Sequence, residues 1–421
     1  MLILNRGRPS QSRSDPLLFS SRRVFLNGKP HVDFRKGLNT LFTRNALSMY
    51  LGIQENIYKR HFAAWMADPD PQAKEYMMPF RDLNMETSLR VFCGDYISEK
   101  GQKDISDHYW LITLALQLVN FPFALPGTKV YNAIKARKMT IKWFEHASAE
   151  SKKRMAAGGE PNCLIDGWIK AMQDARAERE NPDLGSDARR TLVRDFSDRE
   201  IALAVLSFLF ASQDAMSSGL TYLFQHVADQ PELLRKVREE QYRLRGGQLD
   251  APITLDLIDQ MEYTRNVVKE SLRIKPPVIM VPYTAHKAFK IDDNYTVPKG
   301  TMVIPSFWNS LHDPQAYPDP DKIIPERWMQ GPDSPAQQHP RNWLVFGSGP
   351  HYCIGQQYAL MHLTAVLAAA SISMNWKHEI TPTSNKVRVI AGIFPEDGAR
   401  MKFSPRPAPS PTATPEEAAA A

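Results

Sequence analysis

One cysteine stands out as a residue whose surroundings could do chemistry. Cys353 lies in a loop with three glycines, Phe346 to Gly355, directly before an apolar stretch with helical periodicity. Glycine permits backbone angles and close approach that a side chain would prevent. Near a helix N-terminus, unpaired amide N–H groups and the helix dipole favour the thiolate, the form that binds metal. The loop therefore predicts a thiolate metal site; a buried structural cysteine is the alternative.

The same loop resembles the cysteine loop of the cytochrome P450 superfamily. Phe346, Gly349, Cys353 and Gly355 match its Phe-x-x-Gly-x-x-x-Cys-x-Gly pattern, and His351 stands where that family has a basic residue that touches a haem propionate. The resemblance implies haem b with Cys353 as the axial iron ligand, in a mainly α fold with small β-sheets. It also implies a separate NADPH-dependent reductase, which agrees with the lack of a dinucleotide-binding Gly-x-Gly-x-x-Gly motif after a strand.

A carboxylate lies in the middle of the most apolar predicted helix. Ser197 to Glu200 forms a capping-box pattern, and the helix is predicted to continue to Gln230. Asp214 within it is either a structural helix acid or, as the resemblance implies, the acid that relays protons to the haem. Because an alanine follows where many members of the family have an alcohol, Ser217, Ser218 or an ordered water would complete the relay.

Three further charged residues match the family by their spacing. Glu270 and Arg273 lie on one face of a predicted helix, which taken alone describes a common surface pair. The resemblance implies a buried network that also includes Arg327 and fixes the haem loop. Near the start of the chain, Arg35 resembles an arginine that binds a haem propionate, with His31 in place of a tryptophan; a surface arginine is the alternative.

Four segments, 24–29, 208–215, 276–283 and 342–347, are similar to the fungal C-22 sterol desaturases. This resemblance implies oxidation of an ergosterol precursor, with formation of a side-chain double bond, at the endoplasmic reticulum membrane surface. Other sterol or lipid monooxygenation and a non-catalytic haem-binding remnant stay open as alternatives. The residues expected to line the sterol pocket, each of which could equally be ordinary core, are Phe210, Ala211, Ala215, Met280, Val281 and Pro282.

Composition sets the outer limits. With 421 residues, 43% hydrophobic and 23% charged, the chain can bury a large core. Its formal charge of +6 comes without a nucleic-acid recognition motif, so nucleic acid is not expected as a partner. No apolar run reaches the roughly 18 residues of a spanning helix, so the chain is expected to carry no membrane anchor.

The chain is expected to contain one folded domain between two irregular ends. Residues 1–23 are predicted to be irregular, 24–403 to form the cytochrome P450 domain, and 404–421 to be a disordered low-complexity tail. Relative to the family, the domain is expected to lack its anchor, first helices and opening strands, which would leave the haem pocket open on one side.

Overall fold

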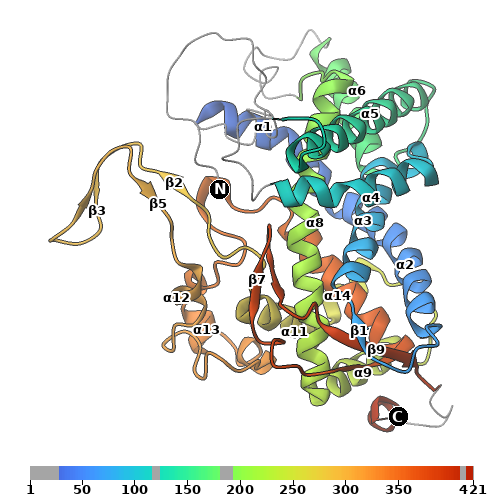
Figure 1. The fold of residues 1–421 in the computed structure, drawn as a ribbon, viewed down its shortest axis with the longest axis vertical. Helices are drawn as coiled ribbons and strands as arrows, with labels where there is room; N and C mark the ends of the chain where they lie inside the picture. The colour runs from blue at the N-terminus through green and yellow to red at the C-terminus, as the bar shows by residue number, and fades with distance from the viewer. Residues whose placement is uncertain (1–27, 116–123, 181–192, 408–413, 421) are drawn as a thin grey trace.

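The computed structural model describes residues 28–115, 124–180, 193–407 and 414–420 (Figure 1). The segment 1–23 and most of the matched segment 24–29 lie outside these residues. Helices make up most of the described chain, as predicted. They are α1 (Lys29–Asn39), α2 (Arg44–Met66), α3 (Met77–Cys93), α4 (Glu99–Ala115), α5 (Lys129–Ala156), α6 (Leu164–Arg179), α8 (Asp198–Asp229), α9 (Pro231–Arg245), α10 (Leu255–Gln260), α11 (Glu262–Ile274), α12 (Phe307–Leu311), α13 (Pro335–Gln338), α14 (Gln356–Ser373) and α15 (Pro415–Ala420).

The strands are short and antiparallel. β1 (Lys74–Glu75), β9 (Arg400–Pro405) and β6 (Met374–His378) form a sheet in that order. The remaining strands form pairs: β2 (Tyr283–Thr284) with β5 (Met302–Val303), β3 (Phe289–Lys290) with β4 (Thr296–Val297), and β7 (Val387–Val389) with β8 (Ile393–Pro395). In Figure 1 the β2 to β5 region projects from the helical body. This architecture confirms the predicted fold class.

Helix α8 runs through the middle of the helical body (Figure 1). Ser197 and Glu200 form the predicted capping box, and the helix ends at Asp229, one residue before the expected boundary. It packs against α3 and α5 and also contacts α11 and α14. By length and composition it could span a membrane, but 56% of its apolar window is buried inside the protein, as in a core helix.

Gly219 marks the place where α8 meets two neighbouring helices. A methyl group there would meet Leu272 of α11 at 3.4 Å and Leu363 of α14 at 3.5 Å. The helix that follows the cysteine loop is therefore held against α8 about one and a half turns beyond Asp214.

The chain end differs from its predicted disorder. Residues 404 and 405 belong to β9, and α15 forms near the C-terminus, while 408–413 and 421 lie outside the described residues. The α15 residues Ala418 and Ala419 are buried, and Arg406 donates to the Ala418 carbonyl oxygen. A helix docked on the protein therefore replaces part of the expected disordered tail.

Candidate functional site

The cysteine loop is closed by a backbone hydrogen bond and turned by two glycines. The Cys353 amide donates to the Phe346 carbonyl at 2.9 Å. Gly347 and Gly349 both have φ near 71°, where a side chain would be strained. Gly355 is the N-cap of α14, and a Cβ there would lie 3.9 Å from the Cys353 Sγ. The loop thus presents the thiol at the start of a helix, as the sequence predicts.

The surroundings of Cys353 act on its thiol in opposite directions. Partial burial raises its pKa, while the Gly355 amide and the charge of Arg35 lower it, with burial the larger effect. The helix terminus alone therefore does not produce the thiolate that the sequence argument favoured. A bound metal ion would do so, because coordination removes the thiol proton.

Basic side chains of α1 gather over the cysteine loop. The rings of His31 and His351 stack with centroids 3.9 Å apart. Arg35 donates to the Tyr352 carbonyl at 2.5 Å, and its guanidinium lies 4.9 Å from the Tyr352 ring centroid. Within the described ranges, no carboxylate forms an ion pair with these basic groups. Such a cluster suits a ligand that carries carboxylates of its own.

α8 carries accessible alanines within a largely buried stretch. Ala211 is exposed and Ala215 is partly exposed, although the helix around them is largely buried. They lie one and two turns from Gly219, the residue that meets α14. In the cysteine loop, a Cβ on Gly347 or Gly349 would meet no atom within 4 Å. Open space beside a thiol and a basic cluster fits a flat, anionic macrocycle such as haem.

Asp214 is buried and ion-paired. Arg81 of α3 donates to its Oδ1, and the Thr113 hydroxyl of α4 donates to its Oδ2 at 3.2 Å. The Arg81 guanidinium lies 4.5 Å from the Trp110 ring centroid. Arg81 is not among the residues expected at this site. Nothing local singles it out, because α3 also carries Asp82, Glu86 and Arg90.

Neither of the predicted relay serines, Ser217 and Ser218, is hydrogen-bonded to Asp214. The Ser217 hydroxyl donates at 2.5 Å to the Gln213 carbonyl of its own helix. Ser218 donates at 2.5 Å to the Ile393 carbonyl of β8. Both hydroxyls are fully buried. The role of Ser217 in proton transfer therefore stays a prediction without a direct contact behind it.

The three residues of the expected charge network do lie together. Glu270 accepts from Arg273 Nε at 2.8 Å and from Arg327 Nε at 3.0 Å. The Ile324 amide and the Trp328 indole N–H also donate to it, each at 3.0 Å. All three charged side chains are almost completely buried. The network joins α11 to the segment around Ile324–Trp328, which precedes the cysteine loop in the chain.

The expected sterol-pocket residues come from α8 and from the segment before β2. A Cβ on Gly392 would lie 3.2 Å from the carbonyl oxygens of both Asp214 and Pro277, so this segment begins against α8. Met280 is 51% exposed. Val281, Pro282, Ala215 and Phe210 are partly buried, and Ala211 is exposed. The contacts place the two segments near each other, and the pocket itself stays a prediction.

Comparison with known proteins agrees with this geometry. The family model of cytochrome P450 matches residues 12–390. The chain belongs to the cytochrome P450 family. A solved structure described as retinoic acid bound cyanobacterial CYP120A1 superposes with a TM-score of 0.74 at 21% identity, covering 93% of this chain and 82% of that one. At this identity the likeness supports the fold alone.

Curated relatives are much closer in sequence. The chain is 48% identical over 388 residues to the C-22 sterol desaturase erg5 of Aspergillus fumigatus, covering 90% of this chain and 74% of the relative. It is 44% identical over 386 residues to C-22 sterol desaturase ERG5 of Saccharomyces cerevisiae, covering 91% and 70%. It is 41% identical over 389 residues to cytochrome P450 monooxygenase oblE of Emericella variicolor, covering 90% and 73%.

Membership of this family implies haem b as the cofactor and electrons from a partner reductase. The bound haem supplies the activation of dioxygen by two electrons. Of this chain's residues, Cys353 would hold the iron, and His31, Arg35 and His351, which gather over the cysteine loop, would hold the haem carboxylates.

Proposed function

We propose that the protein is a sterol C-22 desaturase that inserts a double bond into the side chain of an ergosterol precursor. The observation that carries the proposal is the 44 to 48% identity to C-22 sterol desaturases over nine-tenths of the chain. The geometry is compatible with it, since a basic cluster gathers over the cysteine loop and α8 carries accessible alanines beside Asp214.

In this proposal each part of the site has a separate task. Cys353 binds the iron, Phe346, Gly349 and Gly355 shape its loop, and Arg35 and His351 bind the haem carboxylates. Asp214 would take part in the delivery of protons. The chain's contribution to the chemistry is orientation: it holds two adjacent side-chain carbons near the reactive centre and excludes water.

The substrate and partners follow from the same proposal. The rigid rings of the sterol would lie along apolar residues, with Phe210, Ala211 and Ala215 on α8 facing Met280, Val281 and Pro282. An NADPH-dependent reductase would supply electrons at the endoplasmic reticulum membrane surface. The exposed apolar side chains of the projecting β2 to β5 region, among them Ile291 and Tyr295, are compatible with work beside a lipid phase.

The test is expression with haem, a reductase and a C-22 saturated sterol. We expect a reduced, carbon monoxide-bound spectrum typical of a thiolate ligand and a C-22 unsaturated product. Cys353→Ala should remove both the thiolate spectrum and the product. Cys163 is a buried cysteine at the N-cap of α6, and Cys163→Ala should leave both unchanged.

The products separate the proposal from its alternatives. A hydroxylated sterol in place of the alkene would show a monooxygenase of another specificity. A normal thiolate spectrum without sterol turnover would support a haem-binding protein that has lost catalysis.

A further inference from the structure

The β7–β8 hairpin is fastened to α8 about one helical turn beyond Asp214. The Ser218 hydroxyl donates to the Ile393 carbonyl at 2.5 Å, and both residues are buried. The Ile393 amide donates to the Pro277 carbonyl at 3.3 Å. One residue of β8 therefore ties the hairpin to α8 through its carbonyl and to the segment before β2 through its amide.

The turn of this hairpin, residues 390–392, approaches α8 so closely that a larger residue would crowd it. A Cβ on Gly392 would lie 3.2 Å from the carbonyl oxygens of Asp214 and Pro277 and 3.5 Å from the Ser218 Cβ. The φ of Gly392 is not positive, so close approach, and not the backbone angle, favours glycine here. Ser218, Gly392 and Ile393 thus meet at one junction, which we call the hairpin lock.

A second side-chain bond holds the base of the hairpin. The Gln225 amide donates to the Ser384 carbonyl at 3.4 Å. Gln225 follows Ser218 by seven residues, which is about two helical turns, so both side chains lie on one face of α8. The hairpin therefore lies along this face, with its turn beside Asp214.

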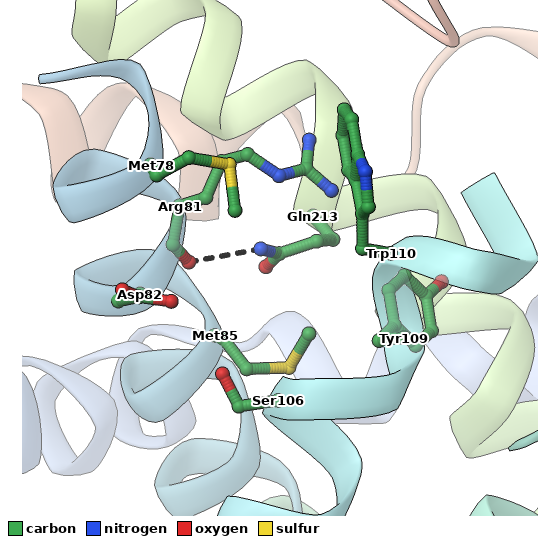
Figure 2. Close-up of a pocket in the computed structure, with 8 residues that line it drawn as sticks. All are labelled: Met78, Arg81, Asp82, Met85, Ser106, Tyr109, Trp110 and Gln213. Atoms are coloured by element: carbon green, nitrogen blue, oxygen red, sulfur yellow. Dashed lines mark hydrogen bonds between the residues drawn. The ribbon is translucent and has the colours of Figure 1, made fainter. Parts of the chain in front are cut away.

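The side of α8 that faces α3 and α4 is held separately (Figure 2). Gln213 donates to the Arg81 carbonyl at 2.9 Å and accepts from the Asn84 amide at 2.9 Å. Beside Arg81 lies a cavity of about 20 Å³, which is room for about one water molecule. Because α8 is anchored to α3 at the level of Asp214, the hairpin takes its position from α8.

Each of the three segments joined by the hairpin lock carries accessible apolar side chains next to it. Arg388 of β7 donates to the Met77 Sδ at 3.0 Å, so strand alternation turns its neighbours to the opposite face. That face of β7 is exposed and apolar. Accessible apolar groups on joined segments suit a rigid, uncharged ring system. They are Val387 and Val389 of β7, Val278, Ile279 and Met280 after Pro277, and Ala211 and Ala215 of α8.

We propose that Ser218 is a positioning residue, which fixes β7 against α8 through the hairpin lock and so sets where the sterol side chain is held. The inference rests on the proposed function, because it concerns how that substrate is oriented. The Ser218 hydroxyl holds the Ile393 carbonyl and does not pass protons. Alkene formation needs two adjacent carbons near the reactive centre, so a shifted wall changes the product as well as the affinity.

Ser218→Ala is the first test. It removes the donor that the buried Ile393 carbonyl bonds to. We expect the sterol dissociation constant, measured from the change in haem absorbance on sterol addition, to rise about fivefold. KM should rise with it, while kcat summed over all products changes less than about twofold, because the cysteine loop and the Asp214 carboxylate are untouched. The share of alcohol among the products should rise about threefold.

The control for this variant is Ser207→Ala. The Ser207 hydroxyl also lies on α8, but it donates at 2.9 Å to the Leu203 carbonyl of its own helix. Ser207→Ala should therefore bind the sterol as the parent does. Equal dissociation constants in Ser218→Ala and Ser207→Ala would overturn the proposal.

Gly392→Ala reaches the same junction by another route. It keeps the Ser218 hydroxyl and pushes the turn away from α8, so the sterol dissociation constant should again rise about fivefold. Gly52→Ala is the control, since a Cβ on Gly52 would meet no atom within 4 Å. Because both changes act on one contact, the double variant should bind about as weakly as the weaker single variant. Effects that multiply would show two independent sites and would contradict the hairpin lock.

Hydrogen exchange separates this inference from the proposed function. In the haem-loaded protein without sterol, amide exchange at Ile390 and Ile393 should be about tenfold faster in Ser218→Ala than in Ser207→Ala. A lower kcat with unchanged exchange and unchanged KM would make Ser218 a proton relay and reject the positioning role. A parent protein that binds the sterol but forms no alkene would reject the desaturase, and the exchange and binding comparisons would still decide on the hairpin lock.

Discussion

The protein contains two buried groups of charged side chains, one around Glu270 and one around Asp214, and their carboxylates are hydrogen-bonded to different extents. Around Glu270, both carboxylate oxygens accept from charged and uncharged protein donors. Arg273 donates further to the Leu311 carbonyl at 2.9 Å and to the Pro320 carbonyl at 2.6 Å. In this first region the Glu270 carboxylate and the Arg273 guanidinium are hydrogen-bonded to protein groups on all sides.

Around Asp214, the second region is less complete. Arg81 and Thr113 are its side-chain donors in the described part of the chain, and a cavity large enough for water adjoins Arg81. A saturated network suits a fixed scaffold, because moving any member would strand the others. A pair beside water can exchange partners, which is what a group that handles protons needs.

The largest expected effect breaks the first region. Glu270→Gln should lower the free energy of unfolding by about 3 to 5 kcal/mol, because two buried guanidinium groups lose their counter-charge. Denaturant unfolding followed by circular dichroism would measure it. Glu239→Gln is the control: it breaks a partly exposed pair with Arg235 and should change stability by less than about 1 kcal/mol. Equal losses in the two variants would show that the network is not structural.

A smaller loss is expected in the second region. Arg81→Met should lower the free energy of unfolding by about 1 to 3 kcal/mol, since water from the adjoining cavity can solvate part of the stranded Asp214 charge. Adding Asp214→Asn should recover part of that loss. A loss as large as that of Glu270→Gln would remove the proposed difference between the two regions.

Acid should destabilise the fold through two buried histidines. His226 of α8 bonds to Ser271, the neighbour of Glu270, at 2.9 Å, and His362 of α14 bonds to the Tyr58 hydroxyl at 2.7 Å. Burial lowers the pKa of both histidines from 6.5 to about 3. The unfolded chain therefore binds more protons between these values, and stability falls as pH drops below 6.5.

Each of these two histidines should contribute a loss of about 2 kcal/mol on going to pH 5. Unfolding curves at several pH values would measure it. His226→Gln should flatten the dependence, whereas replacement of the exposed His108 by glutamine should leave it unchanged. A pH-independent stability would mean that these rings are hydrated.

Sequence reasoning reached the features that local pattern encodes. The capping box predicted the start of α8, and the glycine spacing predicted a cysteine loop that ends at a helix. The Arg327 partner of Glu270 came from resemblance, since 57 residues separate the two in the chain. Nothing local indicates that Arg81, 133 residues before Asp214, faces it, because that contact depends on how α3 packs on α8.

Two differences have local causes that the sequence does contain. Ser217 has the spacing to bond the carbonyl four residues earlier, which is a common alternative to bonding a neighbouring acid. The tail carries Thr414 and Glu417 in a capping-box arrangement ahead of an alanine run: the Thr414 amide donates to the Glu417 carboxylate at 2.8 Å. The low-complexity composition of residues 404–421 led to a prediction of disorder, although this helix start is present in the sequence.

The smallest expected effect on stability concerns Arg35, which belongs to neither buried region. Arg35 is only partly buried and joins α1 to the cysteine loop through the Tyr352 carbonyl. Arg35→Gln should change the free energy of unfolding of the haem-free protein by less than about 1 kcal/mol. Its haem dissociation constant should nevertheless rise by about fivefold, because a charge-assisted bond to a carboxylate is lost. Haem titration followed by absorbance would measure this, with the adjacent exposed Lys36→Gln as the control. Equal haem affinity in both variants would show that the basic cluster over the loop does not hold the cofactor.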